Sequence, residues 1–396
     1  MKREALTVFA LGHKLLTFKP RKTSICYLMA CVVVHAGAGY HSKSKEKKYN
    51  KLCSEACSLA GRLLSVDHKS AIDAVEAAVA YLEDCPLTNA GIGSNLSING
   101  YVECDAGIMS GSTLQFAGIG AVRNMKNPVK VARLLLQSQI DHPVGELGRV
   151  PPSVLVGDGA HVWAASKGYS VDNSDLVTKH SRVSWEKYKS WLFNGNEMNA
   201  TTRDPHFNHH ENVPELKRSR VHRFDTVGAV CIDIEGKIAA ASSSGGIAMK
   251  YEGRLGQACT YGCGCWAEEL SSSSSIGVVT SGTGEQLIRT QLAQRSAERF
   301  NSDSISVSEI VHSSLTDGFL NSKYLSCDME KFAGVAGVYA NFERIDFPNV
   351  EVFFGHSTRS MSVGHYLPSI MKKPSVHVSR KQIDKPTYIE VYAYTI

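Results

Sequence analysis

The chain has 396 residues, of which 43% are hydrophobic and 20% are charged. This composition excludes a mostly disordered, collagen-like or coiled-coil protein, and no apolar stretch reaches the ~18 residues that a membrane-spanning helix requires. Residues 1–30 carry six basic side chains and one acidic side chain, which accounts for the net charge of +5 and leaves the rest close to neutral. We therefore expect a globular protein with no nucleic acid and no membrane as partner.

Residues 1–30 are predicted to be a variable N-terminal extension. Their apolar run leads straight into the first expected strand without a small-residue cleavage site, which argues against a targeting peptide but leaves it open. Eleven cysteines, an odd number in a long chain, favour a reducing compartment over a disulfide framework. Cys263 and Cys265 form a C-x-C pair with no zinc-finger partner downstream, so we expect buried small side chains there rather than a metal site.

Hydrophobic periodicity predicts mixed strands and helices in the first half of the chain. A valine-rich run at 27–34 is typical of a strand buried on both faces, and Ser70 is placed to cap a helix. In chain order we expect a strand at 27–34, helices at 49–64 and 70–83, a glycine-punctuated β region at 88–121, a helix at 129–137 and a strand–helix pair at 153–167.

A polar stretch interrupts this pattern from about 172 to 223. Within it, residues 195–224 are predicted to form a flexible loop, because structureless segments of this length in compact domains are functional or mobile. The loop contains His206, His209, His210 and His222, which we interpret as solvated residues rather than metal ligands. The basic run at 217–220 fits a nuclear import signal or a solvated charge cluster equally well.

Regular patterns return at residue 226. We expect strands at 226–234 and 238–244 joined by a turn at Glu235 and Gly236, a strand at 276–281, a helix at 285–300, and strands at 334–342 and 350–355. No repeat of about 20 to 50 residues is visible, which argues against solenoids and propellers. Strands and helices intermix throughout, so the class is α/β or α+β.

Thr226 follows Asp225 in the only Asp-Thr pair of the chain, between the expected loop and an expected buried strand. A threonine hydroxyl needs an adjacent base to act as a nucleophile at neutral pH. Cleavage of the bond between Asp225 and Thr226 would free an α-amine with a pKa of about 8, and that amine can be the base. One Asp-Thr pair carries little information alone, so the hypothesis depends on residues elsewhere.

Four glycine-rich turns each offer a side chain at the end of an expected strand. Such turns let the backbone approach a substrate closely, as an oxyanion hole or a carboxylate clamp requires. Any one of them is equally well explained as a tight turn, but the four together favour a site. They are Asn89-Ala90-Gly91, Ser244-Gly245-Gly246, Gly253-Arg254-Leu255-Gly256 and Ser281-Gly282-Thr283-Gly284-Glu285.

Four segments resemble, in order and spacing, the threonine aspartases (taspases) of the type 2 asparaginase family of N-terminal nucleophile hydrolases. They are HAGAGYHS at 35–42, TNAGIGSNL at 88–96, DTVGAV at 225–230 and YGCGCWAE at 261–268, and the resemblance covers about 32–370. It implies an αββα sandwich made as an inactive precursor that cuts itself before Thr226. The products would be an α chain, 1–225, whose hydrolase part is 31–225, and a β chain, 226–396, assembled as α2β2.

The resemblance also implies catalytic roles. Thr226 would be the nucleophile and, through its freed amine, the general base, and Ser244 would position it. The hydroxyl of Ser281, the backbone N–H of Gly282 and the side chain of Asn89 would stabilise the oxyanion.

The remaining implied roles concern the precursor and the substrate. Gly37 would help to shape the cleavage site, Arg254 would grip the substrate carboxylate as a bidentate guanidinium, and Gly284 would line the same pocket. Small-molecule asparaginases carry Asp after this arginine turn to bind the α-amine of asparagine, whereas Gln257 stands here. The neutral side chain favours a substrate aspartate whose nitrogen is already in a peptide bond. Thr283 and Ser242 also depart from the family pattern, which bears on rate rather than on reaction type.

The leading hypothesis is an endopeptidase that cuts proteins after aspartate without a metal or another cofactor. By resemblance, its substrates would be nuclear regulators such as trithorax-type histone methyltransferases and the precursor of general transcription factor IIA, and its location the nucleus and cytoplasm. Two alternatives stay open: an isoaspartyl peptidase or L-asparaginase on the same scaffold, and a non-catalytic scaffold protein that never matures.

Overall fold

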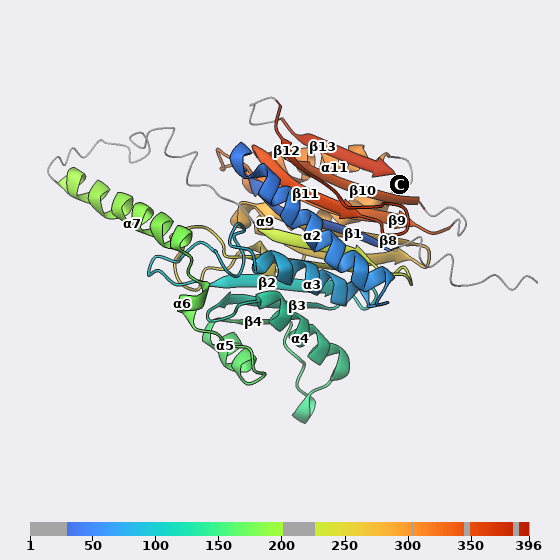
Figure 1. Cartoon of the computed structure of the whole chain (residues 1–396), viewed down its shortest axis with the longest axis horizontal. Helices are drawn as coiled ribbons and strands as arrows, with labels where there is room; N and C mark the ends of the chain where they lie inside the picture. The colour runs from blue at the N-terminus through green and yellow to red at the C-terminus, as the bar shows by residue number, and fades with distance from the viewer. Residues whose placement is uncertain (1–29, 201–225, 302–304, 344–348, 383–387, 396) are drawn as a thin grey trace, which may run out of the picture.

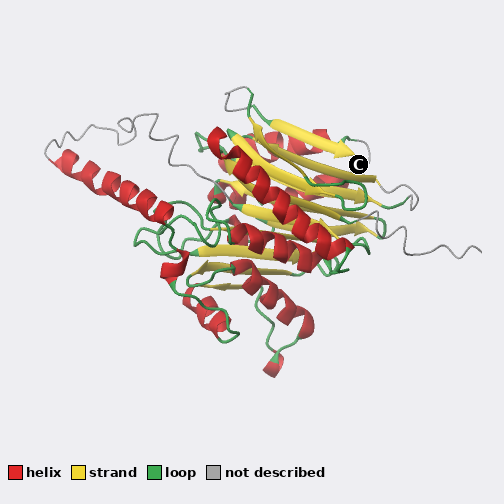
Figure 2. Ribbon diagram, in the orientation of Figure 1, coloured by secondary structure: helices red, strands yellow, loops and turns green. Residues whose placement is uncertain are grey.

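The computed structural model describes residues 30–200, 226–301, 305–343, 349–382 and 388–395. Two β-sheets face each other at its centre, and helices cover the outer face of each sheet (Figure 1). Figure 2 shows the same view coloured by secondary structure, with helices covering the strands of the larger sheet. This order of layers, helix–sheet–sheet–helix, confirms the α/β class and the αββα sandwich.

The first sheet has eight strands among the described residues, in the order β12-β11-β1-β5-β6-β2-β3-β4. Neighbouring strands are antiparallel except for β3 and β4, which are parallel. The strands are β1 (Cys31–Gly39), β2 (Cys104–Ser110), β3 (Phe116–Val122), β4 (Val154–Val156), β5 (Val227–Ile232), β6 (Ile238–Ser244), β11 (Ser360–Tyr366) and β12 (Ser375–Arg380). The strand that follows Thr226 therefore lies in the middle of this sheet.

The second sheet is antiparallel, in the order β13-β10-β9-β8-β7. Its strands are β7 (Cys265–Ser271), β8 (Ser274–Gly282), β9 (Ala333–Asn341), β10 (Asn349–His356) and β13 (Glu390–Thr395). The C-terminal segment, 371–396, lies outside the family resemblance, yet it supplies one edge strand to each sheet, β12 and β13.

Helices α2 to α5 pack on the first sheet and α9 to α11 on the second, whereas α7 extends away from the sheets (Figure 1). The α-helices are α2 (Glu46–Ser65), α3 (Ala71–Glu83), α4 (Pro128–Asp141), α5 (Gly157–Ala165), α6 (Asn173–Leu176), α7 (Lys179–Ala200), α9 (Gly284–Thr290), α10 (Leu292–Glu298) and α11 (Val307–Leu315). Shorter helical turns are Lys43–Lys45, Glu146–Gly148, Gln257–Cys259, Arg299–Asn301, Thr316–Leu320 and Lys323–Leu325. No helix in the described ranges is long and apolar enough to cross a membrane.

Strand β1 shows why a continuous apolar run forms a central strand here. All nine of its residues are buried, and Cys31 and Val33 belong to the core that includes the second sheet. Val32, Val34 and Ala36 belong to the core beneath α2 to α5. Because both faces of the sheet are covered, the strand needs no alternation of apolar and polar residues.

Local sequence signals set several boundaries. Ser70 is the N-cap of α3: its Oγ accepts from the Asp73 N–H at 3.2 Å, while the Asp73 carboxylate accepts from the Ser70 N–H at 3.4 Å. This capping box confirms the prediction for Ser70. Pro128 is the first residue of α4, a position whose N–H has no hydrogen-bond partner within a helix, so the missing N–H of proline costs no bond. Gly236, with φ of 78°, lies in the predicted turn between β5 and β6.

Most expected elements differ from the structure by a few residues, and two differ by more. The strand predicted at 27–34 begins at Cys31 and continues to Gly39, and 27–29 lie outside the described residues. The helix predicted at 285–300 is two helices, because Gln291 adopts a left-handed conformation with φ of 48°. The break lets the Gln294 N–H donate to the Gly262 carbonyl at 3.0 Å, which docks α10 on the turn before β7.

The loop predicted at 195–224 also starts too early, because residues 195–200 belong to helix α7. Apolar periodicity is weak in this polar helix, and a tertiary contact near its start anchors it: Trp185 Nε1 donates to the Ser97 carbonyl at 2.9 Å. The rest of the predicted loop lies outside the described residues, together with its four histidines, its basic run and the extension at 1–29.

Candidate active site

Thr226 immediately precedes β5 and has 3% of its surface exposed. The β5–β6 hairpin pairs Val227 with Ser243, so the next residue of β6, Ser244, lies beside Thr226. The Thr226 hydroxyl donates to Ser244 Oγ at 3.1 Å and accepts from Gln257 Nε2 at 2.8 Å. These two bonds orient the oxygen and direct its proton toward Ser244, as a nucleophilic hydroxyl requires.

A glycine turn connects Ser244 with Asn89. The Gly246 N–H donates to Ser244 Oγ at 3.0 Å, and Asn89 Nδ2 donates to the Gly246 carbonyl at 2.7 Å. A Cβ on Gly245 would lie 2.6 Å from Asn89 Oδ1, so this approach requires glycine. The structure thus brings Asn89 next to the partner of the nucleophile, with its side-chain amide bonded to Gly246.

Arg254 lies beside Gln257 and Gly284. Its Nε and Nη2 each bond to Glu285 Oε1 at 2.8 Å, and its side chain is 14% exposed. A Cβ on Gly284 would lie 2.6 Å from Arg254 Nη2 and 2.8 Å from Gln257 Oε1, so the glycine keeps this space open. The three predicted substrate-binding residues therefore lie together. The family resemblance assigns the guanidinium of Arg254 to a substrate carboxylate, and here Glu285 is hydrogen-bonded to two of its three nitrogens.

The buried carboxylate of Asp105 supports the turn that carries Arg254, a role that the sequence analysis missed. Asp105 lies opposite Ser244 in the register of β2 and β6. Its Oδ2 accepts from the Gly256 N–H at 2.8 Å and its Oδ1 from the Ala121 N–H at 2.7 Å. Hydrogen bonds to a charged acceptor are strong, so they fix the backbone next to Arg254. An acidic residue near the start of a mostly apolar strand was the available signal.

Ser281 and Gly282 end β8, on the second sheet. Ser281 Oγ accepts from the Ala38 N–H at 2.9 Å, which ties this strand to the irregular part of β1 at Gly37, where φ is 106°. Gly282 has φ of 146°, and a Cβ there would overlap with the Phe332 carbonyl oxygen, so only glycine fits. The oxyanion roles of Ser281 and Gly282 and the cleavage-site role of Gly37 stay predictions.

His35 is a fully buried histidine against the backbone of Thr226. Burial lowers its pKa to about 3, although the Thr226 backbone acts in the opposite direction. His35 lies opposite Gly228 in the register of β1 and β5, and a Cβ on Gly228 would lie 2.5 Å from His35 Nε2. The imidazole is therefore neutral and adds no positive charge beside the nucleophile.

The site thus combines a hydroxyl, an amide donor and a guanidinium, which suits attack on a carbonyl carbon near a substrate carboxylate. Asp225 lies outside the described residues, so the structure describes only the Thr226 side of the bond that is expected to be cut. Within the described ranges, no group of three His, Cys, Asp or Glu side chains could hold a metal ion. Cys263 and Cys265 are buried free thiols.

The sequence of this chain is similar to those of known proteins over most of its length. Residues 28–324 match the family described as asparaginase. The chain is 31% identical to an isoaspartyl peptidase of Escherichia coli over 285 residues, which cover 71% of this chain and 79% of the relative. It is 34% identical to a plant-type L-asparaginase of Pyrococcus abyssi over 272 residues, 68% and 79% of the two chains. It is also 35% identical to the isoaspartyl peptidase/L-asparaginase of Homo sapiens over 266 residues, 66% and 74% of the two chains.

Proposed function

The chain belongs to the type 2 asparaginase family of N-terminal nucleophile hydrolases. Within this family, we propose that it is a self-processing threonine endopeptidase that cleaves proteins after aspartate. The observation that carries the proposal is Gln257, whose buried side-chain amide donates to the Thr226 hydroxyl at 2.8 Å. A neutral amide engaged in this way offers no counter-charge to the free α-amine of an amino acid. An aspartate whose nitrogen lies in a peptide bond needs no such partner.

Self-cleavage would begin when Thr226 Oγ attacks the carbonyl carbon of Asp225. The peptide C–N bond breaks, the nitrogen takes up a proton in exchange for the one that Oγ loses, and the acyl group moves to Oγ as an ester. Water then hydrolyses the ester, which leaves a carboxylate on Asp225 and a free amine on Thr226. Ser244 supports this sequence because its Oγ accepts the hydrogen bond of the attacking hydroxyl at 3.1 Å.

Cleavage of a substrate would use the freed amine of Thr226 as general base. The amine takes the Oγ proton as Oγ attacks the substrate carbonyl, and the proton passes to the departing nitrogen when the C–N bond breaks. Water then releases the acyl group. Arg254 would hold the aspartate carboxylate throughout, which places the scissile carbonyl within reach of Oγ.

The test has two stages. A denaturing gel of the expressed chain should show two fragments instead of one 43.1 kDa band, and mass spectrometry should find Thr226 at the start of the smaller one. The processed protein is then offered matched peptides with an internal Asp–Gly or Asn–Gly bond. Cleavage of the aspartyl peptide alone supports the proposal, and a chain that stays whole contradicts it.

An isoaspartyl peptidase or L-asparaginase is the second candidate, and the names of the relatives favour it. It requires a site for a free α-amine, for which Gln257 offers no charge. Hydrolysis of an isoaspartyl dipeptide or of free asparagine, with no cut in aspartyl peptides, would select this candidate.

We further propose that the processed fragments assemble as α2β2, and that the enzyme acts on transcription regulators in the nucleus and cytoplasm. The motif resemblance supports both statements. Light scattering on the processed protein tests the assembly, because α2β2 has twice the mass of one processed chain. Imaging of a fluorescent fusion tests the location.

A further inference from the structure

Glu103 is a buried carboxylate that the proposed reaction does not use. It directly precedes β2, and its side chain is 3% exposed. Its Oε1 accepts from Arg123 Nε at 2.8 Å and from Nη2 at 2.7 Å, and its Oε2 accepts from the Gly253 N–H at 3.1 Å. Because Gly253 is the residue before Arg254, Glu103 joins the turn that carries the proposed substrate-binding arginine to the start of β2.

The carbonyl oxygen of Glu103 holds a second point of the same loop. It accepts from Lys250 Nζ at 2.8 Å, and the Lys250 side chain is buried. A buried ammonium needs a polar partner, so this bond fixes Lys250 relative to Glu103. Glu103 therefore holds the loop at residues 250 and 253, both on the N-terminal side of Arg254.

Asp105 holds the loop on the C-terminal side of Arg254, where its Oδ2 accepts from the Gly256 N–H at 2.8 Å. Residues 103 and 105 are two positions apart in the extended segment that leads into β2, so their side chains point to the same side of it. The turn from Gly253 to Gly256 is thus bonded at both ends to carboxylates of one short segment, with Arg254 between the two bonds.

At Gly253 the backbone is held by hydrogen bonds rather than by close packing. The residue is exposed, and a Cβ on it would meet no atom within 4 Å. The Arg254 N–H donates to the Tyr251 carbonyl at 3.2 Å, which bends the chain locally but does not attach it to the sheet. A hydrogen bond to a carboxylate is stronger than one to a neutral acceptor, so Glu103 attaches this side of the turn to β2.

We propose that Glu103 is a positioning residue that orients Arg254 toward the carboxylate of the substrate aspartate. The Glu103 carboxylate fixes the Gly253 backbone, Arg123 fixes the carboxylate, and Arg254 alone contacts the substrate. This inference rests on the proposed endopeptidase function and adds to it a residue that determines specificity without touching the substrate. A displacement of about 1 Å at a binding group can cost roughly a hundredfold in rate, so loss of the bond to Gly253 has a measurable effect.

Two substitutions break this bond without deleting the side chain. Glu103→Gln has one acceptor oxygen, so it cannot accept from both Arg123 and the Gly253 N–H, and its amide group turns a donor toward one of them. Glu103→Asp keeps the negative charge beside Arg123, but it is one methylene group shorter and cannot reach both partners. If one variant does not fold, the other still tests the inference.

Glu252→Gln is the matched control within the same network. Glu252 Oε2 accepts from Arg123 Nη2 at 2.8 Å, and its Oε1 accepts from Asn99 Nδ2 at 2.9 Å. The substitution therefore takes a carboxylate away from Arg123 and leaves the bond between Glu103 and Gly253 in place.

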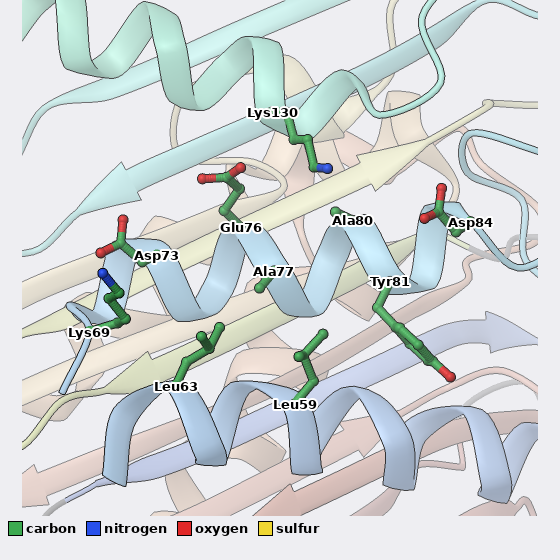
Figure 3. Close-up of a pocket in the computed structure, with 10 residues that line it drawn as sticks. All are labelled: Leu59, Leu63, Lys69, Asp73, Glu76, Ala77, Ala80, Tyr81, Asp84 and Lys130. Atoms are coloured by element: carbon green, nitrogen blue, oxygen red, sulfur yellow. The ribbon is translucent and has the colours of Figure 1, made fainter. Parts of the chain in front are cut away.

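Glu76→Gln is the control elsewhere in the fold. Glu76 is a partly buried carboxylate in a groove formed by α2, α3 and α4, and Figure 3 shows it on the side of α3 toward α4. Its Oε2 lies 4.0 Å from Arg133 Nε, so the substitution removes another carboxylate that faces an arginine.

The assay measures cleavage of the peptide with an internal Asp–Gly bond by processed protein. Melting curves and denaturing gels first show that each variant is folded and processed. We expect Glu103→Gln and Glu103→Asp to lose kcat/KM by at least about tenfold, as loss of a charge-assisted hydrogen bond implies. The loss should appear mainly as a higher KM, because Arg254 binds the carboxylate in the bound substrate and in the transition state alike. Both control variants should stay within about twofold of wild type, as surface substitutions usually do.

A double-mutant cycle separates positioning of Arg254 from general support of the fold. If Glu103 acts through Arg254, Glu103→Gln should cost less than about twofold in a chain that already carries Arg254→Ala, because no guanidinium is left to orient. A residue that only supports the fold would cost the same factor in both chains. Single-turnover reactions at high enzyme concentration measure the slow cleavage by the Arg254→Ala chains.

The inference is overturned if folded Glu103→Gln and Glu103→Asp cleave the Asp peptide as wild type does, if the loss is equal with and without Arg254, or if Glu252→Gln loses as much as Glu103→Gln. A chain that folds with neither substitution assigns Glu103 to the stability of the fold, which also overturns it. In each of these cases wild type still cuts the Asp peptide, so the proposed function survives. Wild type that leaves this peptide uncut removes the proposed function, and the inference fails with it.

Discussion

The substitution Arg254→Ala is expected to cripple cleavage of aspartyl substrates while the chain still cuts itself. Nε and Nη2 of Arg254 are bonded to Glu285, whereas Nη1 has no hydrogen-bond partner among the described residues. Nη1 is therefore the nitrogen that can bind a substrate carboxylate without first displacing Glu285. Self-cleavage brings its two groups together within one chain, and proximity supplies much of the advantage there.

The size of the effect follows from burial. With 14% of its side chain exposed, Arg254 is largely desolvated, and losing one partner of such a charged pair costs about 2 to 5 kcal/mol. This corresponds to a fall in kcat/KM of roughly thirtyfold to several thousandfold. Lysine should restore activity only in part, because a single ammonium cannot hold Glu285 and the substrate carboxylate at once in the geometry of the planar guanidinium. Glu285→Gln should lower KM for the aspartyl peptide, since it removes the competing carboxylate from Nε and Nη2.

The assay compares peptides that differ only in Asp or Asn at the cut position. Arg254→Ala should lose kcat/KM on the Asp peptide and change little on the Asn peptide. Arg289→Ala is the control, because Arg289 is an arginine of α9, the helix that carries Glu285, and is bonded to Asp328 at 2.8 Å and 44% exposed. If kcat/KM of Arg254→Ala on the Asp peptide stays within about threefold of wild type, Arg254 does not bind the carboxylate.

Three further predictions test the site and the fold. Thr226→Ala should abolish self-cleavage and activity, because both need its hydroxyl, whereas Thr226→Ser should retain part of both; gels that show a processed Ala variant would refute the nucleophile assignment. Gly282→Ala should lower the free energy of unfolding by at least about 2 kcal/mol in denaturant titrations, because its φ of 146° and the Phe332 carbonyl leave no room for a Cβ. Gly159→Ala is the control and should not lower it, because a Cβ at Gly159 would meet no atom within 4 Å. Burial lowers the pKa of His356 to about 4, below an unfolded value near 6.5, so native-state stability should be full above pH 6.5 and fall by up to roughly 1.4 kcal/mol per pH unit toward pH 4. The melting temperature should therefore fall more between pH 7 and pH 5 in wild type than in His356→Asn. Equal falls in the two proteins would contradict this prediction.

The sequence alone determined the features that depend on neighbouring residues. Apolar periodicity placed α2, α3, β6 and β9 within a few residues of their bounds, and Ser70 was identified as a cap because capping joins residues three positions apart. The class and the layered sandwich also followed, from intermixed elements and from motif order. The Asp225-Thr226 pair indicated a nucleophile only in combination with distant glycine turns, whose roles the resemblance supplied.

Only the tertiary structure decided which distant groups meet. The bond between Gln257 and Thr226 joins residues 31 positions apart, and that between Ala38 and Ser281 joins residues 243 positions apart. The break at Gln291 and the helical start of the predicted loop depend on contacts with Gly262 and Ser97, which periodicity does not contain. Glu83, the last residue of a predicted helix, is fully buried because α4 packs against it. The free energy of such groups is set by burial and partners from other elements, and these exist only once the sheets and helices have packed.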